Sequence, residues 1–205
     1  MLNLSAKILA MGIGLALALS AAQAQVKGDA TKAKALVDTV CIACHGADGN
    51  GPVPMFPRLA GQSAEYLLKQ MQDFKNNKRP GEIMAPNVAN LSADDMANLA
   101  LFFAGQKAVP APVGDPTLVT RGKKLFDDGN AASGVPACSG CHGANGEGSS
   151  LYPRVAAQHV EYTIDQIKQF ASGKRKNDKR LMQAVATRMS EDETRAVAQY
   201  LASLP

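Results

Sequence analysis

All four cysteines of the chain and two of its three histidines fall in two copies of one motif, Cys-x-x-Cys-His. The six residues are Cys41, Cys44 and His45 in the first copy and Cys138, Cys141 and His142 in the second. Two thiols at this spacing reach the two vinyl groups on one edge of a porphyrin and can join it as thioethers. The histidine that follows directly is then carried under the ring, where its imidazole can bind iron. The two motifs therefore predict two covalently bound haem c groups.

Three other uses of a Cys-x-x-Cys pair compete with haem attachment. A zinc site needs a second pair of ligands at finger spacing, and the only other histidine is His159. A thioredoxin-like redox pair belongs to a βαβ pattern, and no segment of the chain alternates like a half-buried strand. Two structural disulfides suit an exported chain, but they do not explain why a histidine follows each pair. Haem attachment accounts for the thiols and the histidines together.

Residues 1–24 have the pattern of a secretory signal peptide. Lys7 is their only charged side chain, residues 8–19 are an unbroken run of apolar residues and glycine, and Ala22-Gln23-Ala24 is an A-x-A cleavage site. The run is shorter than the roughly 20 apolar residues that span a bilayer, so an uncleaved anchor is the weaker alternative. Export predicts a periplasmic location and leaves peripheral association with the membrane open. The net charge of +4 does not indicate nucleic-acid binding.

Beyond residue 24 the chain is an internal duplication. The aligned pairs are Phe56/Tyr152, Pro57/Pro153, Arg58/Arg154, Glu65/Glu161, Tyr66/Tyr162, Gln70/Gln166, Phe74/Phe170, Lys78/Lys174 and Arg79/Arg175. The offset between these pairs is 96 residues, and it becomes 98 from Met84 and Met182 onward. Such small changes are expected in loops that join a shared framework. The pattern predicts an N-terminal domain at residues 25–108 and a C-terminal domain at 117–205, each with one haem. The segment 109–116, which is rich in proline, is the predicted linker.

Each half is expected to be all-helical. The first helix is predicted at residues 29–40 and its counterpart at 116–126, and Ser63 is expected to cap the helix that follows the proline-containing loop. The last helix of each half begins with a capping-box sequence, namely Ser92 with Asp95 and Ser190 with Glu193. Apolar residues then recur at helical spacing in both halves.

The second axial ligand of each iron distinguishes electron transfer from ligand binding. A methionine in this position raises the reduction potential and suits electron transfer, whereas an open position suits peroxide chemistry. Of the six methionines beyond residue 24, only Met84 and Met182 align with each other. Each lies eight residues before the capping serine of the last helix, Ser92 or Ser190. We predict that Met84 and Met182 are axial ligands. The alternative is that both pack in a loop, as methionines often do.

Pro57 and Pro153 follow their histidines by 12 and 11 residues. A ligating histidine usually donates its other N–H group to a fixed acceptor, and a carbonyl in a rigid turn can serve. We predict this orienting role for both residues, with simple turn prolines as the alternative.

Three further sets of polar residues bear on function. Four repeated side chains either bond haem propionates or are ordinary helix-face and loop residues, and the sequence does not separate these interpretations; they are Tyr66, Tyr162, Arg79 and Arg175. His159 aligns with Ser63 and is expected to be an exposed helix-start residue rather than a ligand. The basic segment 174–180 runs directly into Met182. It is either a solvated loop or a surface that docks an acidic partner.

The segments C-I-A-C-H-G-A-D-G-N at 41–50, F-P-R-L-A-G-Q at 56–62 and E-Y-L at 65–67, together with the tandem repeat, resemble the dihaem cytochrome c4 family. The resemblance covers nearly all of the chain beyond residue 24. It implies two class I cytochrome c domains, each wrapped around one covalent haem and related by a pseudo-twofold axis, with the haem edges facing each other. The second half departs from the first at residues 156–158, where it reads Ala-Ala-Gln and the first half reads Ala-Gly-Gln.

The resemblance also implies a function and a set of ligands. The expected protein is a periplasmic electron carrier and not an enzyme. It would take electrons from a quinol-oxidising complex or a dehydrogenase and pass them to a terminal oxidase. Each haem would be served by two cysteines, a histidine and a methionine, which are Cys41, Cys44, His45 and Met84 for the first haem and Cys138, Cys141, His142 and Met182 for the second.

Two other classes of protein remain as alternatives. A dihaem peroxidase or a haem-bearing dehydrogenase subunit needs at least one open or switchable iron. A methionine in the same register of both halves argues against that class. A binding module without haem is the third class, and a haem stain on a denaturing gel excludes or supports it.

Overall fold

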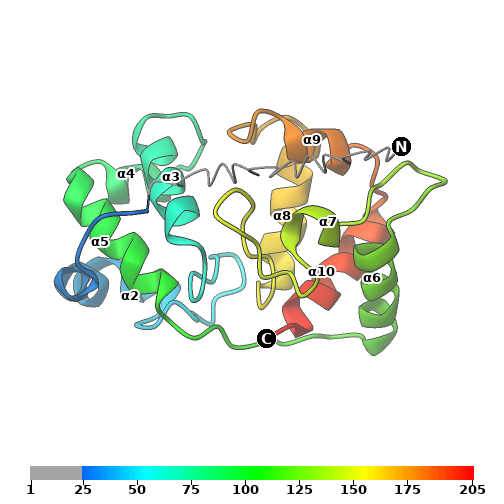
Figure 1. Ribbon diagram of the computed structural model, residues 1–205, viewed down its shortest axis with the longest axis horizontal. Coiled ribbons are helices and arrows are strands. Elements are labelled where there is room, and N and C mark those ends of the chain that lie inside the picture. The colour runs from blue at the N-terminus through cyan, green and yellow to red at the C-terminus, as the bar shows by residue number, and fades with distance from the viewer. Residues whose placement is uncertain (1–24) are drawn as a thin grey trace, which may run out of the picture.

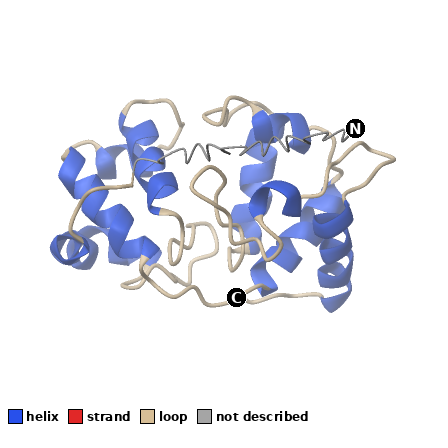
Figure 2. Cartoon of the chain, in the orientation of Figure 1, coloured by secondary structure: helices blue, strands red, loops and turns tan. Residues whose placement is uncertain are grey.

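The computed structural model describes residues 25–205, and the signal peptide predicted at residues 1–24 lies outside them. The described chain forms two helical halves that lie side by side (Figure 1). Apart from one isolated antiparallel bridge between Asn130 and Val135, its regular structure is helical (Figure 2). The predicted all-α class is confirmed. No helix in this part of the chain is long and apolar enough to cross a bilayer.

The first half begins with one continuous helical run that ends in the first Cys-x-x-Cys-His motif. Its parts are η1 (Ala30–Ala33), α1 (Lys34–Leu36), the π-helical η2 (Val37–Cys41) and α2 (Ile42–His45). The side chain of Asp29 caps the run by accepting a hydrogen bond from the Thr31 backbone N–H. The helix predicted at residues 29–40 therefore continues into the motif. Three helices follow, namely α3 (Ala64–Lys75), α4 (Met84–Val88) and α5 (Ala93–Ala104).

The second half repeats this order with one difference. Its helices are α6 (Pro116–Asp128), α7 (Ser139–His142), α8 (Val160–Ala171), α9 (Leu181–Ala186) and α10 (Glu191–Ser203). A loop separates α6 from the second motif, whereas the first half has unbroken helix at this place. The loop contains the Asn130–Val135 bridge. The second motif is therefore positioned by a closed loop and the first by a helix.

Local capping signals are present in the folded chain where the sequence predicts them. Ser92 and Asp95 form a complete capping box at the start of α5, and Ser190 and Glu193 form the same box at α10. Ser63 accepts a hydrogen bond from the Tyr66 backbone N–H at the start of α3. These helices therefore begin at the predicted residues.

Each half has its own apolar core. In the first, η1 packs against α5, and buried residues such as Val37, Leu99 and Phe103 form the cluster. In the second, α6 packs against α10 around residues such as Phe126 and Leu201. Each core thus joins the first and last helices of its own half.

The helices α6 and α10 approach each other closely at Gly122. A Cβ atom placed on Gly122 would lie 2.0 Å from the carbonyl oxygen of Ala196, so only glycine permits this contact.

The segment that joins the halves runs past the end of α10, where the Ala111 N–H donates to the Ala202 carbonyl at 2.8 Å. The green connection in Figure 1 can be followed past the C-terminal end of the chain to α6.

Candidate haem sites and the interface between them

Each motif histidine is the last residue of its helical segment, α2 or α7, and the chain then folds back over it. The Gly51 N–H donates to the His45 carbonyl at 2.8 Å, and the Gly148 N–H donates to the His142 carbonyl at 2.7 Å. A Cβ atom on Gly51 would lie 2.6 Å from the carbonyl carbon of His45, so this return requires glycine. The same fold-back in both halves fixes the backbone of each histidine.

The two imidazoles are oriented in the same way. Nδ1 of His45 lies 2.8 Å from the Pro57 carbonyl oxygen, and Nδ1 of His142 lies 2.9 Å from the Pro153 carbonyl oxygen. A carbonyl only accepts, so Nδ1 carries the proton and donates it, and Nε2 keeps its lone pair. Burial lowers the pKa of each imidazole, which favours this neutral form. A neutral Nε2 aimed away from its anchor is the form in which histidine binds iron.

An aromatic ring flanks each histidine at its edge. Phe56 meets His45 with ring centroids 6.5 Å apart, and Tyr152 meets His142 at 6.4 Å. Both pairs have edge geometry. The residue before each anchoring proline therefore contacts the same histidine, and the two sites match in their apolar as well as their polar contacts.

The cysteines suit covalent attachment better than the competing uses. All four are free thiols, and none is paired in a disulfide within residues 25–205. Burial raises the pKa of Cys138 to about 11 and raises that of Cys41, so both thiols are protonated at neutral pH. In the same range no group of three or more histidine, cysteine or carboxylate side chains is arranged to hold a metal ion. A zinc site of the kind considered from the sequence is therefore not assembled there.

Met84 and Met182 occupy equivalent positions near the start of a short helix, α4 or α9, and both are half-buried. The other methionines of residues 25–205 are accounted for elsewhere. Met96 is buried in α5, whereas Met71 and Met189 pack against the first and second cores. Met55 is 66% exposed. The two aligned methionines thus belong to neither core cluster.

Two buried arginines connect the halves in a reciprocal pattern. Arg79 donates to the Tyr162 hydroxyl at 2.9 Å, and Arg175 donates to the Tyr66 hydroxyl at 2.7 Å. The guanidinium of each lies 4.5 Å from the centre of a phenylalanine ring of its own half. Contacts exchanged in this way are what a pseudo-twofold axis produces.

The same network contains two glutamines that both arginines share. The Gln70 side-chain oxygen accepts from Arg79 at 2.8 Å and from Arg175 at 3.2 Å, and Gln166 accepts from the same two groups at 2.9 and 2.6 Å. Although burial alone would raise the pKa of Tyr162, the charges of the two arginines lower it. Neither guanidinium has a carboxylate partner among the ion pairs of residues 25–205. Neutral oxygens thus make the direct hydrogen bonds to both guanidiniums, while Asp178 acts on Arg175 through its charge alone.

A second reciprocal set closes the interface. The Gln158 side chain bonds both backbone groups of Arg58, and the Gln62 side chain bonds both backbone groups of Arg154, at 2.8–3.0 Å. The second half differs from the first just before Gln158, because Ala157 stands where the first half has Gly61. The Gln158 side chain nevertheless makes the contact that Gln62 makes in the first half, so the departure at residues 156–158 does not disrupt the pairing.

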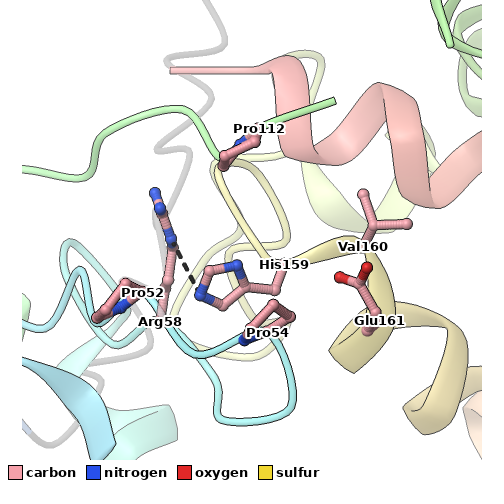
Figure 3. A pocket seen from close by; sticks show the side chains of 7 residues that line it. All are labelled: Pro52, Pro54, Arg58, Pro112, His159, Val160 and Glu161. Carbon is pink, nitrogen blue, oxygen red and sulfur yellow. Dashed lines mark hydrogen bonds between the residues drawn. The ribbon is translucent and has the colours of Figure 1, made fainter. Parts of the chain in front are cut away.

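His159 corrects an expectation from the sequence. It begins α8 as expected, but it is 3% exposed, and its Nε2 atom lies 2.8 Å from the Gly51 carbonyl oxygen of the other half. Figure 3 shows its ring beside Arg58, in a pocket that the prolines of the first half and Pro112 help to line. Burial lowers the pKa of His159. His159 is buried because the two halves dock against each other. The alignment of His159 with Ser63 does not reveal this contact.

Comparisons with known proteins agree with this arrangement. The family model described as cytochrome c matches residues 30–106 and again residues 119–205. Cytochrome c4 of Pseudomonas aeruginosa is 43% identical over 181 residues, which cover 86% of this chain and 89% of the relative. The crystal structure of reduced recombinant cytochrome c4 from Pseudomonas stutzeri has a TM-score of 0.81 at 40% identity, and the match covers 87% of this chain and 100% of that chain. A Thiomonas intermedia protein named thiosulfate dehydrogenase electron acceptor is 38% identical over 170 residues, covering 80% of this chain and 78% of the relative.

The residues fit the prosthetic group that this relationship implies. Each half supplies a pair of thiols at attachment spacing and a histidine with Nε2 unprotonated. The two buried arginines at the interface supply charge that an anionic group would balance. The chain therefore belongs to the cytochrome c4 family of dihaem electron-transfer proteins and carries one covalent haem c at each of its two motifs.

Proposed function

We propose that this chain is a periplasmic carrier of single electrons in which both irons have histidine and methionine as axial ligands. The observation that carries the proposal is repetition. Each half has the same His–Pro carbonyl contact and, in the same register, one methionine that neither core uses. When bound, each haem takes up and releases one electron at its iron.

The residues of the chain have separate tasks at each haem. Cys41 and Cys44 hold the first group, and Cys138 and Cys141 hold the second. The carbonyls of Pro57 and Pro153 keep the proton on Nδ1 of each histidine and set the direction of Nε2.

The haem propionates are proposed to lie at the interface of the halves. Arg79 and Arg175 are 7% and 4% exposed, and both point into the interface network. Guanidinium groups form strong charge-assisted hydrogen bonds with carboxylates, so these two side chains are suited to hold propionates. Tyr66 and Tyr162 belong to the same network and orient the guanidiniums. Of the two interpretations left open by the sequence, the burial of both guanidiniums at the interface, without a direct carboxylate partner in residues 25–205, favours propionate binding.

Axial methionines also separate this function from that of a peroxidase. A methionine on each iron leaves no open position for peroxide, whereas it raises the reduction potential. Met84→Ala and Met182→Ala test the assignment, with the exposed Met55→Ala as the matched control. Each ligand variant is expected to keep both haems attached, lose half of the methionine-to-iron charge-transfer band at the red end of the spectrum, and lower one potential only. An unchanged band and unchanged potentials in either ligand variant would refute that ligand.

The proposed downstream partner is a terminal oxidase that presents an acidic surface. The basic loop, which we define as residues 174–180, has four exposed cationic side chains, namely Lys174, Lys176, Lys179 and Arg180. Arg175 is not among them, because the interface buries it. The equivalent stretch of the first half exposes only Lys78 and Glu82 as charged groups. Complementary charge guides brief encounters between redox proteins, so the contrast supports docking of an acidic partner at the second haem.

The proposed donor is a quinol-oxidising complex or a dehydrogenase. The similarity to a protein named thiosulfate dehydrogenase electron acceptor supports the second of these two donors, a dehydrogenase. Stopped-flow reduction by a purified thiosulfate dehydrogenase and by a quinol-oxidising complex, at equal concentrations, compares the two. The donor that reduces this chain only at the rate of an unrelated control protein is rejected. Recovery of haem-loaded chain from the periplasmic fraction, without residues 1–24, tests the location.

A further inference from the structure

The loop before the proposed axial methionine is two residues longer in the second half than in the first. Four residues separate Arg79 from Met84, and six separate Arg175 from Met182. The two flanking arginines take equivalent places in the interface, so the difference falls entirely within this short connection. The insertion therefore breaks the symmetry of the two haem sites next to a proposed ligand.

Within the longer loop, Asp178 holds the start of α9. Its Oδ2 atom accepts a hydrogen bond from the Met182 backbone N–H at 2.7 Å, and its Oδ1 atom accepts from the Arg180 N–H at 3.0 Å. The Leu181 N–H also donates to the Asp178 carbonyl, at 3.3 Å. Three backbone groups of the segment that carries Met182 are thus bonded to one residue.

The carboxylate stabilises a backbone shape that these residues do not otherwise favour. Lys179 and Arg180 have φ values of +57° and +64°, in the left-handed region that disfavours side chains with a Cβ atom. Arg180 occupies the N-cap position of α9, but its side chain bonds Gln183 instead of capping the helix. Asp178 therefore supplies the cap that the N-cap residue does not.

The first half has no equivalent device among its described residues. Helix α4 begins without a side-chain cap at Ile83, and the Ala85 N–H bonds the Gly81 backbone carbonyl at 2.9 Å. Glu82, the carboxylate nearest to Met84 in sequence, is exposed. The Asn87 side chain donates to the Ile83 carbonyl at 2.7 Å, but no carboxylate among the described residues of this half bonds the start of α4 as Asp178 bonds α9.

The other end of the longer loop is fixed to the first half. The Asn177 side chain donates to Asp73 at 2.6 Å and to Gln70 at 3.0 Å, both on α3, and its carbonyl accepts from Lys69 at 2.8 Å. Asp178 follows Asn177 directly. The cap of α9 is therefore held between an interface anchor and the helix that it starts.

We propose that Asp178 is a positioning residue for Met182, which makes the second haem's methionine harder to displace than the first haem's. The inference rests on the proposed role of Met182 as an axial ligand. By fixing the Met182 backbone N–H and the first turn of α9, the carboxylate limits the movement by which the thioether sulfur would leave an iron. The two sites consequently differ in how firmly the ligand is held, although the ligand types are the same.

Competition with imidazole tests the proposal on the oxidised full-length protein with both haems attached. Loss of the red-end band is followed as imidazole is added, which gives an apparent dissociation constant for each haem. In wild type the second haem should bind imidazole more weakly than the first. Asp178→Ala should tighten imidazole binding at one haem by about fivefold, the size typical of replacing a capping side chain by alanine.

Two further variants separate positioning from general destabilisation. Asp178→Asn retains one acceptor oxygen, which can bond the Met182 N–H but not the Arg180 N–H as well, so its imidazole constant should lie between those of wild type and Asp178→Ala. Glu82→Ala removes the comparable carboxylate of the first half and should change neither constant. Equal constants for wild type and Asp178→Ala at both haems would overturn the inference, as would an Asp178→Asn variant that behaves like Asp178→Ala.

Met182→Ala distinguishes failure of this inference from failure of the ligand assignment. If Met182→Ala leaves the whole red-end band in place, Met182 is not a ligand and the assignment fails with everything that rests on it. If Met182→Ala removes half of the band while Asp178→Ala leaves both imidazole constants unchanged, only the role of Asp178 is refuted.

Discussion

Removing the tyrosine hydroxyls that cross the interface should weaken the whole protein in a measurable and nearly equal way. The perturbation is Tyr66→Phe or Tyr162→Phe, which deletes one oxygen atom and leaves the ring. Each hydroxyl accepts a hydrogen bond from a buried guanidinium of the other half, Arg175 at 2.7 Å or Arg79 at 2.9 Å. The two variants therefore remove the same contact from opposite sides of the pseudo-twofold axis.

The expected loss of stability depends on the hydrogen bonds that each arginine keeps in the variant. A hydrogen bond to a charged group contributes about 1.5–3 kcal/mol to stability. The nitrogen that loses the tyrosine keeps a glutamine acceptor, Gln70 at 3.2 Å for Arg175 and Gln166 at 2.9 Å for Arg79. Each variant is therefore expected to lose stability at the lower end of this range, about 1.5 kcal/mol. For a chain of this size that corresponds to a fall in Tm of about 3–6 °C.

Thermal and urea unfolding of the haem-loaded protein, followed by far-UV circular dichroism, measure this change. Tyr200→Phe is the matched control, because the Tyr200 ring packs against Phe126 in the second core, away from the interface. Its stability is expected to change by less than about 0.5 kcal/mol. A fall in Tm for Tyr66→Phe or Tyr162→Phe no larger than that of the control would refute the assignment of stability to these bonds.

Three other results are expected. Reversal of two exposed lysines, Lys176→Glu with Lys179→Glu, should slow electron exchange with an acidic partner at low salt, and rates equal to wild type there would leave the basic loop as solvated surface. Gly122→Ala should lower the free energy of unfolding by about 2 kcal/mol, because the new methyl group meets the Ala196 carbonyl; unchanged urea denaturation would contradict this close approach. The fragment 25–108 should fold with one haem, because its core cluster uses only its own residues, and an unfolded fragment would show that the halves share one core.

The chemistry of this protein was readable from the sequence because it is local. Haem attachment needs two thiols and a histidine within five residues, and the motif at 41–45 or 138–142 contains all three. Capping boxes are also local, since the serine at the start of α5 or α10 bonds a residue three positions away. Internal repetition adds a prediction that a single motif does not allow, because only Met84 and Met182 of the six methionines beyond residue 24 align with each other.

Tertiary structure decided the contacts that join residues far apart in the chain. Arg79 and Tyr162 are 83 positions apart, and Arg175 and Tyr66 are 109 apart, so no periodicity or spacing relates them. The sequence left these residues between two interpretations, and their burial at the interface favours one of them. The burial of His159 was missed for the same reason, since its neighbour Gly51 lies 108 positions away.

The role of Asp178 falls between these cases. The two-residue insertion beside Met182 is visible in the alignment of the halves, but the alignment does not say what the extra residues do. Only the folded backbone, with Lys179 and Arg180 in left-handed conformations, turns the Asp178 carboxylate toward the Met182 N–H. Sequence determines which groups a chain has and how local hydrogen bonds begin its helices. The docking of the two halves, each with its own core, determines which of those groups meet, because that geometry depends on surfaces assembled from many distant residues.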